Sequence, residues 1–324
     1  MINKIVKFSS LALISASLLI TGCTAQQQDS LLDSALNLAR ESVGFEVKTA
    51  RADDVTLTYM ERASNIENPE TLVLLHGFSA NKDNWISFTK ALDEKYHVIV
   101  VDHAGHGDSE KELSTDYDLA KQAQRLDALM TGLGINTFHI AGNSMGGAIS
   151  AIYSFNYPKK VRSLTLIDAA GVDGENASEY YEALAQGKNP LIATDEASFD
   201  FRMNFTMSQP PFIPWPLKPA MIRQTLAREE INAKIFNDML LTKERFGVMQ
   251  FQQQMQNVTA EHKIPTMIMW GEEDRILDVS AVAKFKQLLP EASVHIFPKV
   301  GHLPMVEIPD ESAAVYQQFL SKVE

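Results

Sequence analysis

A serine stands among three glycines in the segment HIAGNSMGGAIS (139–150), directly after a run of strand-forming residues. Glycine tolerates backbone conformations and close contacts that a Cβ atom would forbid. The spacing therefore predicts a sharp turn that holds Ser144 away from a sheet. The pentapeptide GNSMG (142–146) also fits the pattern G-x-S-x-G, which places a nucleophilic serine between a strand and a helix.

A serine hydroxyl is a weak nucleophile, so it needs a base within hydrogen-bond reach and a third group that orients this base. Of the eight histidines, His302 is the best placed, on a predicted loop between the last strand and the last helix. The orienting carboxylate should lie between the serine and the histidine in the chain. Asp274 follows the predicted strand TMIMW and meets this requirement. The alternatives for the acid are Asp168, Glu272, Glu273 and Asp278.

The oxyanion that develops during acyl transfer needs preorganised N–H donors. We expect one from Met145, which follows the nucleophile at a predicted helix N-terminus. The other should come from Phe78, in the strand-to-turn segment LVLLHGF. These two donors would form an oxyanion hole beside Ser144.

The loop DHAGHGDS (102–109) contains residue types that bind metal ions in other proteins, namely Asp102, His103, His106 and Asp108. We do not expect a metal site here, because the loop resembles a family pattern, D-x-x-G-x-G-x-S, and this resemblance implies that its glycines shape a turn near the site. The proposed chemistry therefore needs no metal and no cofactor.

Strand and helix patterns alternate along most of the chain, as in an α/β sheet with right-handed crossovers. Several of the apolar runs are continuous, which is typical of strands buried on both faces. The predicted strands are 55–60, 71–76, 97–102, 137–142, 163–168, 266–271 and 293–298. The predicted helices include 118–133, 145–157, 279–289 and 312–323.

The interval 172–262 breaks this alternation, because it contains helical patterns and no convincing strand. A structureless loop of that length would be unusual in a compact domain, so we predict an inserted helical cap. The hydrolase core would then consist of 43–171 and 263–324. The cap's apolar segment 205–221 should both pack on the core and line the entrance for an acyl chain. The candidate substrate-binding residues are Phe205, Met207, Phe212 and Trp215.

Four segments resemble motifs of the α/β-hydrolase superfamily: HGFSANKDNW (76–85), GNSMGG (142–147), GEEDRIL (271–277) and GHLPMVEIP (301–309). The first two resemble bacterial lipases and esterases related to the abhydrolase-domain monoacylglycerol lipases. The resemblance implies a mostly parallel eight-stranded sheet flanked by helices. It also implies Ser144 as nucleophile, Asp274 as acid, His302 as base, and Phe78 with Met145 as the oxyanion hole.

These features predict a serine hydrolase that cleaves carboxylic esters of apolar acyl chains through an acyl-enzyme intermediate. The expected substrate is a small apolar ester or an acylglycerol. One alternative is another capped serine hydrolase, such as a carbon–carbon hydrolase or a thioesterase. A second alternative is a lipid-binding lipoprotein without catalytic activity.

The N-terminus has the pattern of a signal peptide, with a basic start and an apolar run too short to span a bilayer. We predict residues 1–22 to be this signal. The residues ITGC (20–23) resemble a bacterial lipobox, which implies cleavage before Cys23 and its acylation. The segment 23–42 would then be a lipid-anchored tether, polar over 24–30, followed by a short amphipathic helix. The resemblance places the chain in the bacterial cell envelope, and Thr24 after the cysteine favours the outer membrane.

Composition and charge narrow the class of partner. The chain has 324 residues with 45% hydrophobic and 22% charged residues, which is enough apolar sequence for one large core. Its formal net charge is −12, so a polyanionic partner such as nucleic acid is disfavoured. Cys23 is the one cysteine of the sequence, and no intramolecular disulfide can form.

Overall fold

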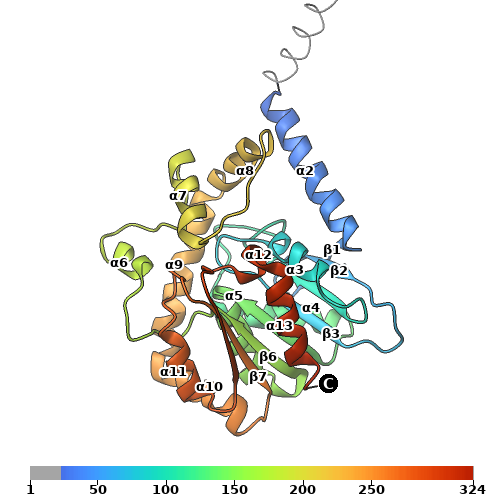
Figure 1. Cartoon of the computed structure of the whole chain (residues 1–324), viewed down its shortest axis with the longest axis vertical. Coiled ribbons are helices and arrows are strands. Elements are labelled where there is room, and N and C mark those ends of the chain that lie inside the picture. Colours follow the sequence, from blue (N-terminus) through green and yellow to red (C-terminus); the bar gives the residue numbers. More distant parts are fainter. Residues whose placement is uncertain (1–22, 324) are drawn as a thin grey trace, which may run out of the picture.

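The computed structural model describes residues 23–323, which form an eight-stranded sheet covered by helices on both faces (Figure 1). The predicted signal segment 1–22 lies outside the described residues. The strand order is β1-β2-β4-β3-β5-β6-β7-β8. The strands are β1 (Glu46–Ala52), β2 (Val55–Arg62), β3 (Thr71–Leu75), β4 (His97–Val101), β5 (Phe138–Asn143), β6 (Val161–Ile167), β7 (Thr266–Gly271) and β8 (Ser293–Phe297).

The sheet is parallel from β4 to β8 in spatial order, and antiparallel at the β1–β2 and β2–β4 pairings. This arrangement confirms the predicted mostly parallel α/β sheet. All seven predicted strands are present, and β1 is the strand that sequence patterns did not indicate. Most of its residues are exposed or half-buried at the sheet edge, so its sequence EVKTARA carries little apolar signal.

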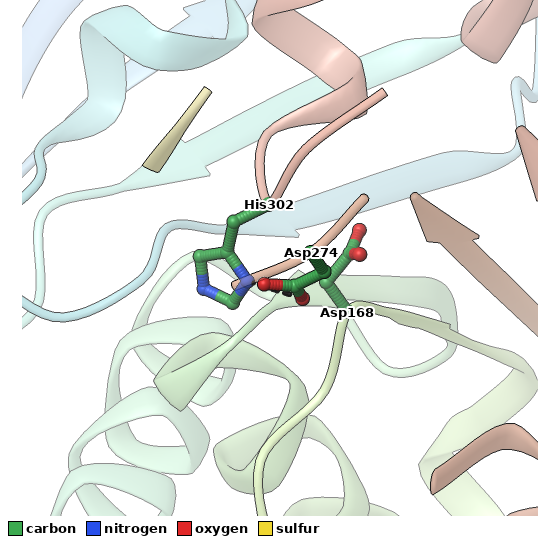
Figure 2. A group of neighbouring side chains, drawn as sticks. All are labelled: Asp168, Asp274 and His302. Carbon is green, nitrogen blue, oxygen red and sulfur yellow. Dashed lines mark hydrogen bonds and ion pairs between the residues drawn. The ribbon is translucent and has the colours of Figure 1, made fainter. Parts of the chain in front are cut away.

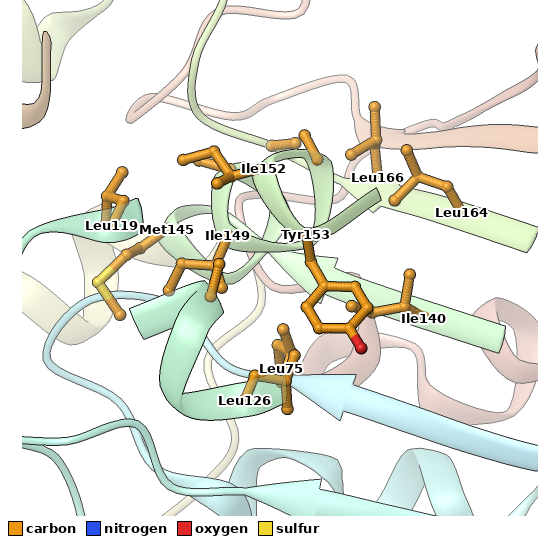
Figure 3. Close-up of a cluster of buried hydrophobic side chains, with 14 of the residues drawn as sticks. Leu75, Leu119, Leu126, Ile140, Met145, Ile149, Ile152, Tyr153, Leu164 and Leu166 are labelled. Atoms are coloured by element: carbon orange, nitrogen blue, oxygen red, sulfur yellow. The ribbon is translucent and has the colours of Figure 1, made fainter. Parts of the chain in front are cut away.

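Alternate residues of the central strands face two separate apolar layers. Val73 and Leu75 of β3 pack on the same side as Ile149 of α5 (Figure 3), whereas Leu72 and Leu74 pack on the other side with Phe88. This is the two-residue period of a strand that is buried on both faces. The helices outside the interval 172–262 are α2 (Ala25–Ser42), η1 (Lys82–Trp85), α3 (Ile86–Lys90), α4 (Leu119–Gly132), α5 (Met145–Asn156), η2 (Pro158–Lys160), α11 (Ala281–Leu288), α12 (Pro304–Glu307) and α13 (Pro309–Leu320).

The described residues of the interval 172–262 contain five helices and no strand. They are α6 (Glu179–Ala185), α7 (Glu196–Thr206), α8 (Leu217–Leu226), α9 (Glu229–Phe246) and α10 (Val248–Ala260). We call this interval the inserted segment. It leaves the sheet at the carboxyl end of β6 and returns at the amino end of the parallel strand β7. Its helices α7 and α8 lie beyond the carboxyl ends of the strands, whereas α10 packs against α5 and α11 beside the sheet (Figure 1).

The polar segment 24–30, which we predicted to be a tether before a short helix, is itself helical from Ala25 onward. Helix α2 begins at Ala25, because Thr24 and Gln27 form a capping box that satisfies the first backbone N–H groups. The helix packs along α8, where Arg223 pairs with Asp29. At its other end, Nε and Nη2 of Arg40 each donate to a carboxylate oxygen of Asp83 at 2.7 Å. Helix α2 therefore bridges the inserted segment and the hydrolase core.

The described residues include no helix with the length and hydropathy to cross a lipid bilayer.

Candidate active site

The turn between β5 and α5 places Ser144 at the carboxyl end of the central strands. Ser144 has φ 55° and ψ −118°, a left-handed conformation that non-glycine residues rarely adopt. The turn tolerates no Cβ at its glycines: a Cβ on Gly146 would lie 2.4 Å from Leu75 O, and one on Gly142 would lie 2.2 Å from Gly146 O. The glycines thus allow the turn to lie against β3 with Ser144 in a strained conformation, and Ser144 is 9% exposed.

His302 and Asp274 form a buried hydrogen bond between two loops that follow β8 and β7. His302 Nδ1 lies 2.7 Å from Asp274 Oδ2 (Figure 2). The other carboxylate oxygen accepts the backbone N–H groups of Ile276 at 2.8 Å and Leu277 at 3.1 Å. Both carboxylate oxygens of Asp274 are therefore held by hydrogen bonds, Oδ2 by the imidazole and Oδ1 by backbone N–H groups. This arrangement leaves Nε2 as the ring nitrogen available to a substrate or a nucleophile.

Backbone contacts hold His302 close to the serine turn. Asn143, the neighbour of Ser144, donates from Nδ2 to His302 O at 3.0 Å. The His302 N–H donates to Thr206 O at 2.9 Å, at the end of α7. Ser144 Oγ has no hydrogen-bond partner among the described residues, so it is not hydrogen-bonded to the imidazole of His302 in this conformation. Catalytic hydrogen bonds are often long before substrate binds.

Asp168 is the alternative acid that lies nearest to the pair. It is fully buried at the end of β6, where its Oδ1 accepts the N–H of Gly271 at 2.8 Å, and its Oδ2 has no partner in the described part of the chain. Burial, together with the charge of Asp274, raises the pKa of Asp168 well above its usual range. The hydrogen bond to the His302 imidazole is made by Asp274, and Asp168 forms no hydrogen bond with His302 in this arrangement.

The remaining carboxylates are less suited to orient His302. Glu272 and Glu273 are exposed, and Asp278 Oδ1 caps the N–H of Ser280 at 2.9 Å. Asp168, Asp274 and His302 form the one group of described residues whose ligand atoms, all within 4.8 Å of one another, could share a metal ion. The short His302–Asp274 contact already uses two of these atoms for a hydrogen bond.

The two expected oxyanion donors lie on either side of the serine. A Cβ on Gly77 would be 3.1 Å from Ser144 Cβ, so the loop that carries Phe78 is packed directly against the turn. Met145 is the first residue of α5, where the helix dipole favours negative charge. No acceptor of the described residues takes the backbone N–H of Phe78 or Met145. Both donors are therefore available to a ligand oxygen.

The segment 102–109 holds the loop that carries Phe78 through hydrogen bonds to His76 and Lys82. His76 Nδ1 bonds to Gly77 O at 2.8 Å, and its Nε2 accepts the N–H of His103 at 3.2 Å. Asp102 accepts from Lys82 Nζ at 2.8 Å. Burial lowers the pKa of His76 to about 3 and holds the pKa of His103 and of His106 well below the usual range. The three imidazoles are therefore neutral packing groups at neutral pH.

The four candidate substrate-binding residues fall into two pairs. Phe205 and Met207 are both 4% exposed, and a Cβ on Gly301 would lie 3.0 Å from Met207 Cα. Phe212 is 88% exposed and Trp215 is 51% exposed, on the connection between α7 and α8. The structure therefore places Met207 beside the histidine loop and buries Phe205 against the guanidinium of Arg275, and it leaves the second pair exposed.

A cavity of about 590 Å³ opens beside Asp274, between the inserted segment and the loop after β7. Its lining is largely polar and includes Met207, Asn204, Glu272 and Glu273, but neither Ser144 nor His302. The residues that line this hollow therefore do not include the serine.

Three residues that support the site were not indicated by the sequence patterns. Glu307 accepts the N–H groups of Gly301 at 3.0 Å and Ser208 at 2.8 Å, so it ties the histidine loop to the inserted segment. Asn143 and Thr206 hold the backbone of His302, as described above. Asn143 occupies the variable position of G-x-S-x-G, and the other two lie in segments whose contacts depend on the fold, so no local signal could have identified them.

Comparisons with known proteins give the following similarities. The alpha/beta hydrolase fold family matches residues 70–309. Lipase 1 of Psychrobacter immobilis is 33% identical over 313 residues, which cover 95% of each chain. Monoacylglycerol lipase ABHD6 of Bos taurus is 28% identical over 88% of this chain and 85% of its own. The crystal structure of a membrane phospholipase A superposes with a TM-score of 0.85 at 36% identity, covering 97% of this chain and 96% of its own.

Proposed function

Because the chain belongs to the α/β-hydrolase family and is a carboxylic ester hydrolase, we propose that Ser144 is its nucleophile, Asp274 its acid and His302 its base. The observation that carries this assignment is the buried 2.7 Å contact between His302 Nδ1 and Asp274 Oδ2 beside the strained Ser144 turn. Each residue lies at the carboxyl end of a strand, where catalytic groups of open α/β sheets gather.

The reaction would proceed in two half-reactions. His302 Nε2 takes the proton from Ser144 Oγ, which attacks the ester carbonyl carbon. The N–H groups of Phe78 and Met145 stabilise the oxyanion, and the imidazolium then gives its proton to the leaving alcohol. Water, deprotonated by the same imidazole, attacks the acyl-enzyme and releases the carboxylic acid and free Ser144. Asp274 keeps the Nδ1–H tautomer and stabilises the imidazolium throughout.

We propose a single acyl chain on a small alcohol as the preferred substrate. Ser144 is only 9% exposed, and in this proposal a substrate reaches it between the inserted segment and the core. A bulky triacylglycerol would enter such a covered site less readily than a monoacyl ester. The names of the relatives, which include a monoacylglycerol lipase and a membrane phospholipase A, support esters of apolar acyl chains.

We propose that the inserted segment is the cap of this site.

We also propose that Cys23 is the lipid anchor of the chain. Cys23 is a free, half-buried cysteine directly before the capping residue of α2. Acylation there would place the lipid next to the helix that packs on α8. The membrane-associated name of the related phospholipase supports attachment to the bacterial cell envelope, and the outer membrane remains the proposed location.

A labelling experiment tests the active-site assignment. We expect a fluorophosphonate probe to label the wild-type chain and not Ser144→Ala, and we expect this variant to lose nearly all hydrolysis of p-nitrophenyl butyrate. Ser150→Ala is the matched control on α5, since Ser150 Oγ is buried on Gly146 O at 2.8 Å. Labelling of Ser144→Ala at the wild-type rate would contradict the assignment.

A further inference from the structure

Two arginines of the inserted segment converge on the loops that follow β3 and β4. Arg202 of α7 donates from Nη1 to Ser79 Oγ at 2.8 Å and to Ser79 O at 3.3 Å. Arg228, just before α9, donates from Nη2 to Gly105 O. Asn232 connects them, because its Nδ2 donates to Ser79 Oγ at 3.1 Å and its Oδ1 lies 3.5 Å from Arg228 Nη2.

Within the described part of the chain, neither guanidinium forms an ion pair with a carboxylate. The acids that act on Arg228 are Asp102 and Asp108, and both already pair with Lys82, at 2.8 and 2.6 Å. Burial and the nearby charge of Arg228 lower the pKa of Arg202 to about 10. Arg202 and Arg228 are two half-buried cations that Ser79 and Asn232 connect, and their mutual repulsion has no paired anion to offset it. An added anion would relieve this repulsion.

The two arginines lie next to the loop that carries the proposed oxyanion donor Phe78. Ser79 directly follows Phe78, the proposed oxyanion donor, and Arg202 is bonded to Ser79. One turn further along α7, Thr206 accepts the N–H of His302 at 2.9 Å, and its Oγ1 bonds back to Arg202 O at 2.9 Å. Helix α7 thus spans the site from the oxyanion loop to the histidine loop, and Arg202 stands on the oxyanion side.

We propose that Arg202 and Arg228 bind a phosphate group carried by the alcohol part of the ester, so that the substrate class includes lysophospholipids. This inference rests on the proposed function. The ester carbonyl oxygen would occupy the Phe78–Met145 donors, and the anion at Ser79 must therefore belong to another part of the substrate. Guanidinium forks match phosphate oxygens in geometry and charge, and each guanidinium keeps N–H donors that the described contacts do not use.

The test compares two esters that differ only in the phosphate: 1-dodecanoylglycerol and 1-dodecanoylglycerol 3-phosphate. Arg202→Gln and Arg228→Gln retain an amide donor for Ser79 and Gly105 and lose the charge. Each should lower kcat/KM for the phosphate ester by about 10-fold or more, as expected for a lost charge-assisted hydrogen bond, and change the neutral ester less than about 3-fold. Arg162→Gln, on the far end of β6 and paired with Glu70, is the matched control and should leave both rates unchanged.

An equal loss of kcat/KM on both esters would overturn the proposal, because the arginines would then only hold the inserted segment against the core. An unchanged ratio in both variants would also overturn it. Calorimetric titration of glycerol 3-phosphate into the full-length Ser144→Ala chain separates this proposal from the proposed function. Binding that is lost in Arg202→Gln would support the anion site even if neither ester were hydrolysed. Equal binding of inorganic phosphate would assign the pair to free phosphate and would overturn the headgroup proposal.

Discussion

A carboxylate oxygen of Asp168 lies within 4.8 Å of one of Asp274, and both side chains are buried at the carboxyl ends of adjacent strands. Two carboxylates at this separation do not both ionise readily. Asp274 receives two backbone N–H bonds and the imidazole, whereas Asp168 receives one backbone N–H bond. Burial, together with the neighbouring Asp274, raises the pKa of Asp168 well above its usual range, which favours its protonated form.

The two aspartates should respond very differently to amide substitution. Asp274→Asn should lower kcat by about 10³- to 10⁴-fold, because the imidazole loses the partner that fixes its tautomer. Asp168→Asn should retain activity within about 10-fold, since an amide reproduces the neutral carboxyl group. Steady-state kinetics on p-nitrophenyl butyrate measures both variants. A greater loss in Asp168→Asn than in Asp274→Asn would show that the acid has been assigned to the wrong residue.

The raised pKa of Asp168 predicts how stability depends on pH. From its ordinary value of 3.8 upward to its raised value, the folded state holds a proton that the unfolded state has released, so stability falls as pH rises. Asp168→Asn should remove this loss. The free energy of unfolding of the variant should exceed that of the wild type at pH 8, and the difference should shrink toward pH 4. Urea denaturation at both pH values tests this. The opposite sign of the difference would mean that Asp168 is ionised in the fold.

The buried histidine cluster predicts sensitivity to acid. The pKa of His76 is about 3 in the fold against 6.5 ordinarily, so the unfolded chain binds more protons between these values and stability falls as pH drops through this window. Burial, and then the neighbouring His76 and Arg228, lower the pKa of His106, so His106 adds to the same dependence of stability on pH. His106→Gln should flatten the loss of urea midpoint between pH 7 and pH 5. His262→Gln, a control at a less buried position, should not change the slope, and an unchanged slope in His106→Gln would contradict the account.

The two exposed aromatic residues between α7 and α8 should act at a lipid surface. Phe212 is 88% exposed and Trp215 is 51% exposed, and α8 packs against the helix that follows Cys23. Replacing both with serine should lower hydrolysis of long-chain esters in vesicles by about 10-fold, through lost apolar burial in the interface, and leave dissolved p-nitrophenyl butyrate within about twofold. If the variant instead altered the chain-length preference for dissolved esters, these side chains would line the acyl site.

The proposed anchor depends on a single thiol. Cys23→Ser should abolish metabolic palmitate labelling and move the chain from the detergent phase to the aqueous phase, because two or three acyl chains are needed for stable attachment. Activity on dissolved short-chain esters should persist, since Cys23 lies outside the site. A wild-type chain that takes up no label and partitions into the aqueous phase would exclude the anchor.

The sequence was most informative where a local rule governs the structure. The G-x-S-x-G turn could be predicted because only glycine permits the close approach of Gly146 to Leu75 O, and the buried strands because apolar runs on both faces are unmistakable. The edge strand β1 escaped detection because its side chains face water. The predicted tether failed for a different reason: its glutamines carry no apolar period, yet Thr24 and Gln27 form a cap that starts a helix.

The supporting contacts of the site could not be read from sequence, because they join segments far apart in the chain. Asn143 reaches His302 across 159 positions, and Arg202 reaches Ser79 across 123. Such contacts depend on how the inserted segment lies on the sheet, which no periodicity encodes. The identity of the acid among five carboxylates likewise needed the geometry of the imidazole.

Helix α2 has a mechanical consequence for how substrate enters. Its 18 residues make a rod about 27 Å long, attached to α8 through Arg223 and to the core through Arg40. An outward movement of α8 would either break the Arg223–Asp29 ion pair or rotate α2 about the Arg40–Asp83 contact. A displacement of the N-terminal end of α2 would act on α8 through the same contacts. Helix α2 would thereby couple the position of α8 to the position of the N-terminal end of the helix.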